Sequence, residues 1–218
     1  MNNVLEYLEK SAIQYPDKIA FSDQKQEITY HQLLLRAKKI GTTLAKQFQP
    51  RTPIPVYMEK GVDTICLLFG IAYAGCFYVM LDLRHPKERI EQILDTLQAR
   101  QIVTSEQESN RLAKLDLSVE KIQIEQLEND IDEEVLKQIR NAHLDIDPLY
   151  GIFTSGSTGK PKGVVVCHRS VIDFIDVFTQ TFAITSEDVI GNQAPWDFDV
   201  SVKDIYSTIC CGATMQII

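Results

Sequence analysis

Residues 149–167 read LYGIFTSGSTGKPKGVVVC, two apolar runs joined by a polar, glycine-rich segment. LYGIFT and GVVVC are short runs of apolar, β-branched and aromatic residues, a composition typical of buried strands. The segment between them, TSGSTGKPKG, holds three glycines, four hydroxyl side chains and two lysines. The stretch therefore predicts two strands joined by a loop whose backbone can approach a ligand closely.

The side chains of this loop are of the kinds that bind polyphosphate. Hydroxyls donate hydrogen bonds, and exposed backbone N–H groups together with two ammonium groups suit a polyphosphate better than a carboxylate. The loop is not a Walker A motif, because Thr154 replaces the first glycine and Pro161 replaces the magnesium-binding hydroxyl. A flexible polar hairpin loop is the alternative. The predicted phosphate-binding residues are Thr154, Ser155, Gly156, Ser157, Thr158, Gly159, Lys160 and Lys162.

Outward from the loop, short apolar runs alternate with segments of helical period. This alternation predicts an α/β protein with mainly parallel sheets flanked by helices. Further strands are expected at 19–23, 27–30, 53–58, 77–81, 100–105, 188–193 and 213–218, and helices at 1–16, 31–47, 86–99 and 169–182.

Two stretches need separate treatment. Residues 64–81 carry no charge and reach the length of a membrane helix, but Gly70 and Gly75 interrupt them, which favours a buried helix ending near Gly75 and then a buried strand. Residues 105–147 are acidic and weakly periodic, and we expect a peripheral helix and a connector there.

Composition and charge argue against nucleic-acid binding, membrane binding and secretion. The chain has 218 residues and a net charge of −8, so a long-range field that attracts nucleic acid or anionic membrane is not expected. Five cysteines follow no metal-ligand spacing, and the first residues lack the pattern of a secretory signal. We expect a cytoplasmic protein with reduced thiols.

The last residues, ATMQII, have the pattern of an interior strand with nothing after them to pair with it. A bare apolar edge is an aggregation hazard. We therefore expect this chain to be part of something longer.

LYGIFTSGSTGKPKGVVVCH resembles the phosphate-loop signature of the adenylate-forming enzymes, the superfamily of acyl-CoA synthetases, luciferases and nonribosomal peptide synthetase adenylation domains. ITYHQL with RAKKIGTTL resembles the first core motif of that family, and FGIAYAGCFYVMLDLRHPKERI resembles the second. Met80 departs from the usual proline of the second motif. The resemblance implies that residues 1–218 form the N-terminal part of an AMP-binding domain.

NQAPWDFDVSVKDIY resembles the aromatic-Asp-x-Ser motif of members that activate amino acids, D-alanine:D-alanyl carrier protein ligases above all. The resemblance implies that Asp199 binds the α-ammonium of the substrate and that Val200 and Lys203 line the side-chain pocket. From these residues alone, a helix cap at Asp199 is the first expectation, and the phosphate loop upstream shifts it to the ammonium ligand. Asp197 and Asp204 compete with it, and only the spacing from Phe198 favours Asp199. Lys203 could pair with an acidic substrate, although extension to solvent is the first expectation.

The sequence gives the histidines weaker functional signals than the phosphate loop or Asp199. His168 matches a histidine that is common in the family near the phosphate loop, and a structural hydrogen bond is the alternative. The sequence gives His31, His85 and His143 no partner.

The resemblance implies ATP-dependent formation of an aminoacyl-adenylate and its transfer to the phosphopantetheine thiol of a carrier protein, with Mg²⁺. The adenine-, ribose- and magnesium-binding motifs and the catalytic lysine of the family would follow Ile218, so we expect no catalytic or metal-binding residue within the chain and no adenylate formation by it alone. An acyl-CoA or aryl-acid ligase and a non-catalytic binding protein remain the alternatives.

Overall fold

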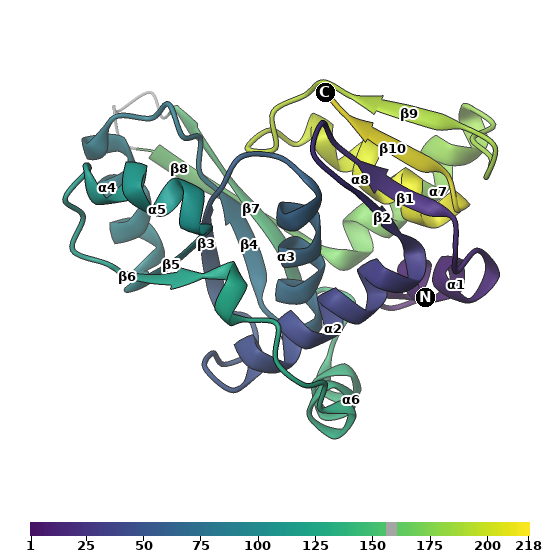
Figure 1. The fold of residues 1–218 in the computed structure, drawn as a ribbon, viewed down its shortest axis with the longest axis horizontal. Helices are drawn as coiled ribbons and strands as arrows, with labels where there is room; N and C mark the ends of the chain where they lie inside the picture. The colour runs from purple at the N-terminus through teal and green to yellow at the C-terminus, as the bar shows by residue number, and fades with distance from the viewer. Residues whose placement is uncertain (156–160) are drawn as a thin grey trace.

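The structure is a computed structural model and describes residues 1–155 and 161–218. It contains two sheets with helices packed between and around them (Figure 1). This arrangement confirms the α/β class expected from the alternation of apolar runs and helical segments. The larger hydrophobic core joins side chains of both sheets to those of the central helices.

A six-stranded sheet carries the glycine-rich segment. Its order is β6-β5-β3-β4-β7-β8, parallel throughout except for the antiparallel pair β7–β8. The strands are β3 (Pro53–Tyr57), β4 (Phe77–Met80), β5 (Gln101–Thr104), β6 (Glu120–Gln123), β7 (Pro148–Ser155) and β8 (Pro161–Cys167). Because the parallel strands share one direction, the loops that follow β3, β4 and β5 lie at the same edge as the β7–β8 turn.

A four-stranded sheet has the order β2-β1-β10-β9. Its strands are β1 (Ile19–Ser22), β2 (Glu27–Thr29), β9 (Val189–Asn192) and β10 (Thr214–Ile217). The expectation of a bare edge at ATMQII is wrong, because β10 pairs in parallel with β1 on one side and with β9 on the other. The partner comes from the other end of the chain, where no local pattern could reveal it.

Helices cover and separate the two sheets. They are α1 (Leu5–Gln14), α2 (Tyr30–Ala45), α3 (Val62–Tyr73), α4 (Lys87–Leu97), α5 (Glu106–Ala113), α6 (Glu133–Ala142), α7 (His168–Thr181) and α8 (Val200–Cys211), with a 3₁₀ turn at Ile124–Gln126. α3 is buried nearly all round, which explains its unbroken apolar sequence. Among the described residues, the helices are all too short or too polar to cross a membrane.

Several local predictions can be compared with these elements. Gly75 lies just after α3 with φ of +70°, so the division of residues 64–81 into a helix and a strand is confirmed. Residues 105–147 contain strand β6 as well as two α-helices, so the expectation of one helix and a connector was too simple. The predicted loop is also shorter than expected, because β7 and β8 extend to Ser155 and from Pro161.

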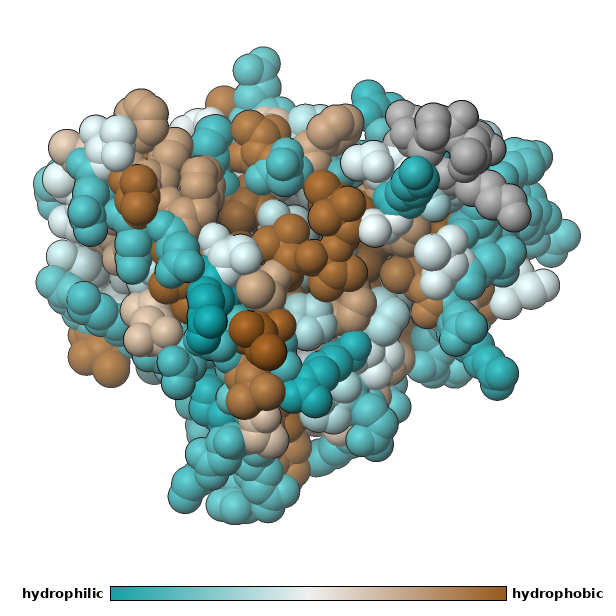
Figure 2. Space-filling view, turned by 180° about the vertical axis from the view of Figure 1, so that it is seen from behind, coloured by the Kyte–Doolittle hydropathy of each residue, from teal (hydrophilic) through white to brown (hydrophobic). Residues whose placement is uncertain are grey.

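One face of the molecule is rich in exposed apolar side chains. Figure 2, the view from behind, shows them gathered across its middle. Large exposed apolar residues on β8 and α7 include Val164, Val165, Phe174 and Val177, and the rings of Phe174 and Phe178 lie 5.5 Å apart. An apolar face of this kind is more typical of an interaction surface than of a free one.

Candidate functional site

The β7–β8 hairpin carries the predicted phosphate loop. Thr154 pairs in register with Lys162, and both are exposed, so a hydroxyl residue and an ammonium residue stand opposite each other at the base of the turn. This pair has the chemistry of an anion site. Gly156, Ser157, Thr158, Gly159 and Lys160 lie outside the described residues, as does the side chain of Ser155.

Asp199 lies at the start of α8 with an exposed side chain. It makes no capping hydrogen bond to that helix, which argues against the alternative in which it serves as a cap. Burial, and after it the negative charge of Asp199, raises the pKa of Tyr150 to about 12. Tyr150 lies on β7, four residues before Thr154, so the charge of Asp199 acts on the strand that leads into the loop.

Asp204, one competitor of Asp199, is buried and fully engaged. Asn192 donates to its Oδ2 at 2.9 Å, and the ammonium of Lys203 donates to its Oδ1 at 2.5 Å. Trp196 in turn donates from Nε1 to Asn192 at 2.8 Å. Asp204 therefore anchors the segment before α8, and both of its carboxylate oxygens already accept a hydrogen bond from within the chain.

The two predicted pocket residues next to Asp199 differ in their surroundings. The Val200 side chain is 44% exposed. Lys203 is only 34% exposed, and its ion pair with Asp204 replaces the extension to solvent that we expected. A substrate carboxylate would have to compete with Asp204 for this ammonium.

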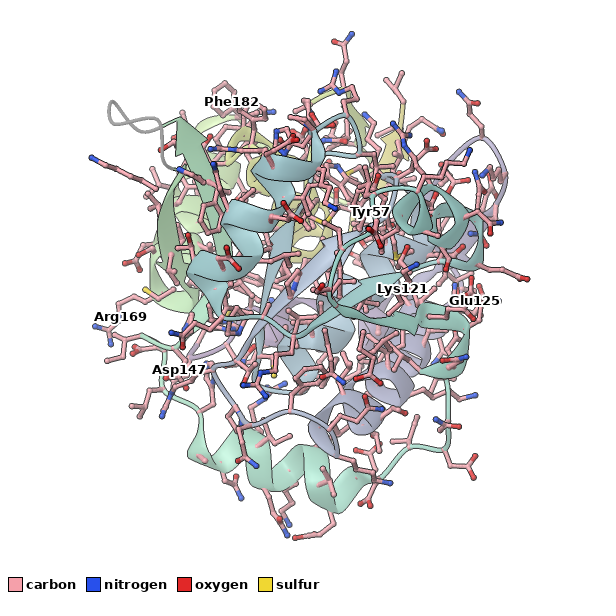
Figure 3. The ribbon with its side chains drawn as sticks, turned by 90° about the vertical axis from the view of Figure 1, so that its left-hand side faces the viewer. Tyr57, Lys121, Glu125, Asp147, Arg169 and Phe182 are labelled. Atoms are coloured by element: carbon pink, nitrogen blue, oxygen red, sulfur yellow. The ribbon has the colours of Figure 1, made fainter. Side chains whose placement is uncertain are left out.

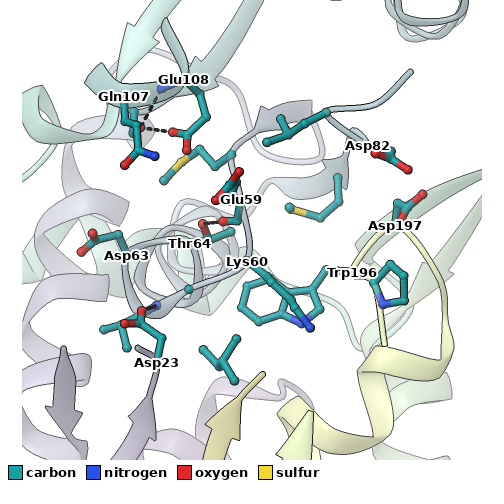
Figure 4. Close-up of a pocket in the computed structure, with 18 of the residues that line it drawn as sticks. Asp23, Glu59, Lys60, Asp63, Thr64, Asp82, Gln107, Glu108, Trp196 and Asp197 are labelled. Atoms are coloured by element: carbon teal, nitrogen blue, oxygen red, sulfur yellow. Dashed lines mark hydrogen bonds between the residues drawn. The ribbon is translucent and has the colours of Figure 1, made fainter. Parts of the chain in front are cut away.

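A cavity of about 560 Å³ opens beside this region, between the loops that follow β1, β3, β4 and β9 (Figure 4). Trp196 and Lys60 project into it. The Lys60 ammonium donates to the carbonyl oxygens of Asn192 at 3.3 Å and Gln193 at 3.2 Å, and burial lowers its pKa. The mixed apolar and charged lining of this cavity is typical of a small-molecule site. Sequence patterns missed Lys60, which stands in no quoted motif, and Trp196, which stands in NQAPWDFDVSVKDIY but was given no role of its own.

His168 lies at the far end of the hairpin from the loop. It is 2% exposed, and its Nδ1 accepts the backbone N–H of Val4 at 3.3 Å. Figure 3 shows Asp147, whose carbonyl oxygen accepts the His168 N–H at 3.1 Å, and Arg169, the next residue in sequence, close together. This geometry gives His168 the structural hydrogen bond that was the alternative to a role near the phosphate loop.

Comparison with known proteins identifies the family. The family model described as "AMP-binding enzyme" matches residues 8–218. The chain belongs to this family. The match agrees with the phosphate-loop signature and with the order of the motifs around it.

Curated relatives in the AMP-binding family are longer proteins. The chain is 28% identical to a "D-alanine--D-alanyl carrier protein ligase" of Lacticaseibacillus casei, over 99% of this chain and 42% of the relative. It is 27% identical to "Tyrocidine synthase 1" of Brevibacillus parabrevis, over 99% of this chain and 20% of the relative. The chain thus spans about two fifths or less of these relatives.

Solved structures of the family share this architecture. The nonribosomal peptide synthetase FmoA3, in its alpha-methyl-L-serine-AMP bound form, superposes with a TM-score of 0.84 at 28% identity, over 99% of this chain and 23% of that one. The structural likeness therefore covers both sheets.

Proposed function

We propose that the protein containing this chain activates an amino acid with ATP, forming an aminoacyl-adenylate, and transfers the aminoacyl group to the phosphopantetheine thiol of a carrier protein. In this proposal residues 1–218 form the N-terminal part of the adenylation domain. Amino-acid ligase and synthetase names among the relatives support the reaction class.

The observation that carries the proposal is the position of Asp199. Its carboxylate is exposed and makes no capping hydrogen bond, and its charge adds to burial in raising the pKa of Tyr150, on the strand that continues to Thr154. A carboxylate of this kind is the natural partner of an ammonium group that loses water on binding. An amino acid held there by its ammonium would direct its carboxylate toward phosphates bound at the hairpin turn.

The chemistry needs no protein nucleophile. A carboxylate oxygen of the amino acid forms a bond to the α-phosphorus of ATP, and the bond from that phosphorus to the bridging oxygen breaks, releasing pyrophosphate. The carrier thiolate then forms a bond to the acyl carbon, and AMP leaves. Thr154, Lys162 and the loop between them would contribute by positioning the phosphates and by stabilising negative charge at phosphorus. Mg²⁺ would neutralise phosphate charge, held by residues outside this chain.

Amino-acid-dependent exchange of labelled pyrophosphate into ATP tests the proposal. The complete gene product should give exchange with one or a few members of a panel of small and acidic L- and D-amino acids, and none without amino acid. Residues 1–218 by themselves should give no exchange. A complete protein that shows no exchange with any amino acid would contradict the proposal.

An acyl-CoA or aryl-acid ligase is the second candidate, because the phosphate loop serves those reactions equally well. Such an enzyme binds no substrate ammonium. Activity with a fatty or aromatic acid that survived Asp199→Ala would favour this candidate over amino-acid activation.

A further inference from the structure

A second group of polar side chains lies where the loops that leave the two sheets meet. Asp82 and His85 belong to the loop between β4 and α4, and Asp197 belongs to the loop between β9 and α8. One ligand atom from each of the three lies within 4.8 Å of the other two. Asp82 and Asp197 face each other at one side of the cavity in Figure 4.

The β4–α4 loop fixes its two members locally. Asp82 Oδ1 accepts the backbone N–H of Arg84 at 2.8 Å, and the backbone N–H of His85 donates to the Asp82 carbonyl at 3.0 Å. Pro86 is then the N-cap residue of α4. The carboxylate and the imidazole are therefore held on one tight turn before any ligand arrives.

Two features show that this group is incomplete. The Nδ1 atom of His85 is buried and has no hydrogen-bond partner among the described residues. Among the described residues, the Asp197 carboxylate forms no salt bridge, although one of its oxygens lies within 4.8 Å of a ligand atom of Asp82 and of His85. Buried polar atoms normally have partners, and an unpartnered one calls for an explanation.

Arg84 neutralises only part of this charge. Its guanidinium donates from Nη2 to Asp82 Oδ2 at 2.7 Å, yet its side chain is 76% exposed. An exposed arginine contributes little to the stability of such a pair and can move aside. The guanidinium therefore occupies the Asp82 oxygen that would otherwise be free for a cation.

We propose that Asp82, His85 and Asp197 form a binding site for one divalent cation of the first transition row, such as Mn²⁺. Two carboxylates and one imidazole suit such an ion better than Mg²⁺ or Ca²⁺, which prefer oxygen ligands alone. Ligand atoms around an ion at about 2.1 Å stand about 3 Å apart, so the side chains draw together from their present separation. Arg84 swings away as the ion binds.

The bound ion links the six-stranded sheet to the four-stranded sheet through their loops. Asp197 stands two residues before Asp199, so the ion also fixes the segment that presents Asp199. The site rests only on the described residues and does not depend on the proposed function.

Titration with Mn²⁺, followed by the electron paramagnetic resonance signal of the free ion, tests the site without nucleotide or amino acid. We expect one Mn²⁺ per chain. His85→Asn and Asp197→Asn should each weaken the affinity about tenfold or more, because each removes a ligand. Asp173→Asn, at an exposed carboxylate on α7, is the matched control and should leave the affinity unchanged.

Arg84→Gln separates a cation site from a simple ion cluster. Removal of the competing guanidinium should tighten Mn²⁺ binding about threefold or more. Mn²⁺ should also raise the Tm of the wild-type chain and not that of Asp197→Asn, and Mg²⁺ should bind at least about tenfold more weakly. Absence of binding, binding that survives both ligand substitutions, or equal affinity for Mg²⁺ would overturn the proposal. Because no substrate is present, failure here is distinct from failure of the exchange assay.

Discussion

Two clusters of aspartate and histidine lie at opposite ends of the six-stranded sheet. We call Asp147, His143 and His168 with Arg51 the closed cluster, and Asp82, His85 and Asp197 the open cluster. In the closed cluster Asp147 accepts from Arg51 Nε at 2.7 Å and from the Leu144 N–H at 3.0 Å, and the His143 and His168 rings lie 4.5 Å apart.

The open cluster has the same residue types, but only Asp82 is paired with a charged side chain, that of Arg84, among the described residues. His85 Nδ1 has no partner among the described residues, and the Asp197 carboxylate meets another carboxylate. The difference teaches how to interpret such clusters. Where all polar groups are paired within the chain, the cluster stabilises the fold, and where they are not, the cluster is available to a ligand. Asp204 and Asp199 on α8 repeat this contrast.

The largest effect on stability is expected at the buried carboxylate of α8. Asp204→Ala leaves the Asn192 amide and the Lys203 ammonium without their acceptor, so the free energy of unfolding should fall by about 3 kcal/mol. Urea denaturation followed by circular dichroism measures it. A loss as small as that of an exposed control, Asp173→Asn, would remove Asp204 from the residues that hold the fold.

The closed cluster should make the fold sensitive to acid. Burial lowers the pKa of His168 to about 3, with the positive charges of His143 and Arg140 acting in the same direction and Asp147 against them. Below pH 6.5 the unfolded chain therefore takes up a proton that the folded chain does not, and stability falls with pH by up to about 1.4 kcal/mol per unit.

For this histidine the loss between pH 6 and pH 4.5 amounts to about 2 kcal/mol. His168→Asn keeps an acceptor for the Val4 N–H but cannot titrate, so its stability should change less over the same interval. Urea midpoints across this pH range measure the difference. Equal pH dependence in wild type and variant would show that another group controls acid sensitivity.

A smaller effect is expected from the carboxylate of the closed cluster. Asp147→Asn weakens its bond to the half-exposed Arg51, which should cost about 1 kcal/mol at pH 7. The pKa of Asp147 lies below its ordinary value, despite its burial, because Arg51 and the Leu144 N–H stabilise the charged form. This contribution is present above about pH 4 and disappears as pH falls further. An Asp147→Asn variant as stable as wild type would show that the cluster contributes nothing.

Much of the fold could be predicted from sequence because its signals are local. Short β-branched runs marked the strands, and Gly75 marked the end of α3. The strand β6 escaped prediction because EKIQ is mostly polar and belongs to the edge of a sheet. The interior place of β10 was predicted from its apolar pattern, but its pairing with β1 was not, because β1 lies at the other end of the chain.

The candidate site likewise holds some residues that local sequence indicated and others that it did not. The spacing from Phe198 indicated Asp199, and the composition of the glycine-rich segment indicated a phosphate loop. The neighbours of His85 and His143 could not be predicted, because Asp197 and His168 come close to them only through the packing of separate elements. Lys203 was expected to extend to solvent, and its pairing with Asp204 depends on how deeply α8 is buried.

Pyrophosphate exchange by Asp199→Asn, measured beside Asp173→Asn in the complete gene product, tests the central claim most directly. We expect Asp199→Asn to lower exchange about 100-fold or more, since a desolvated ammonium would lose its counter-charge, with no change in Tm because the side chain is exposed. Asp173→Asn should match wild type in both. Full exchange by Asp199→Asn would contradict the assignment of the open carboxylate on α8 to substrate binding.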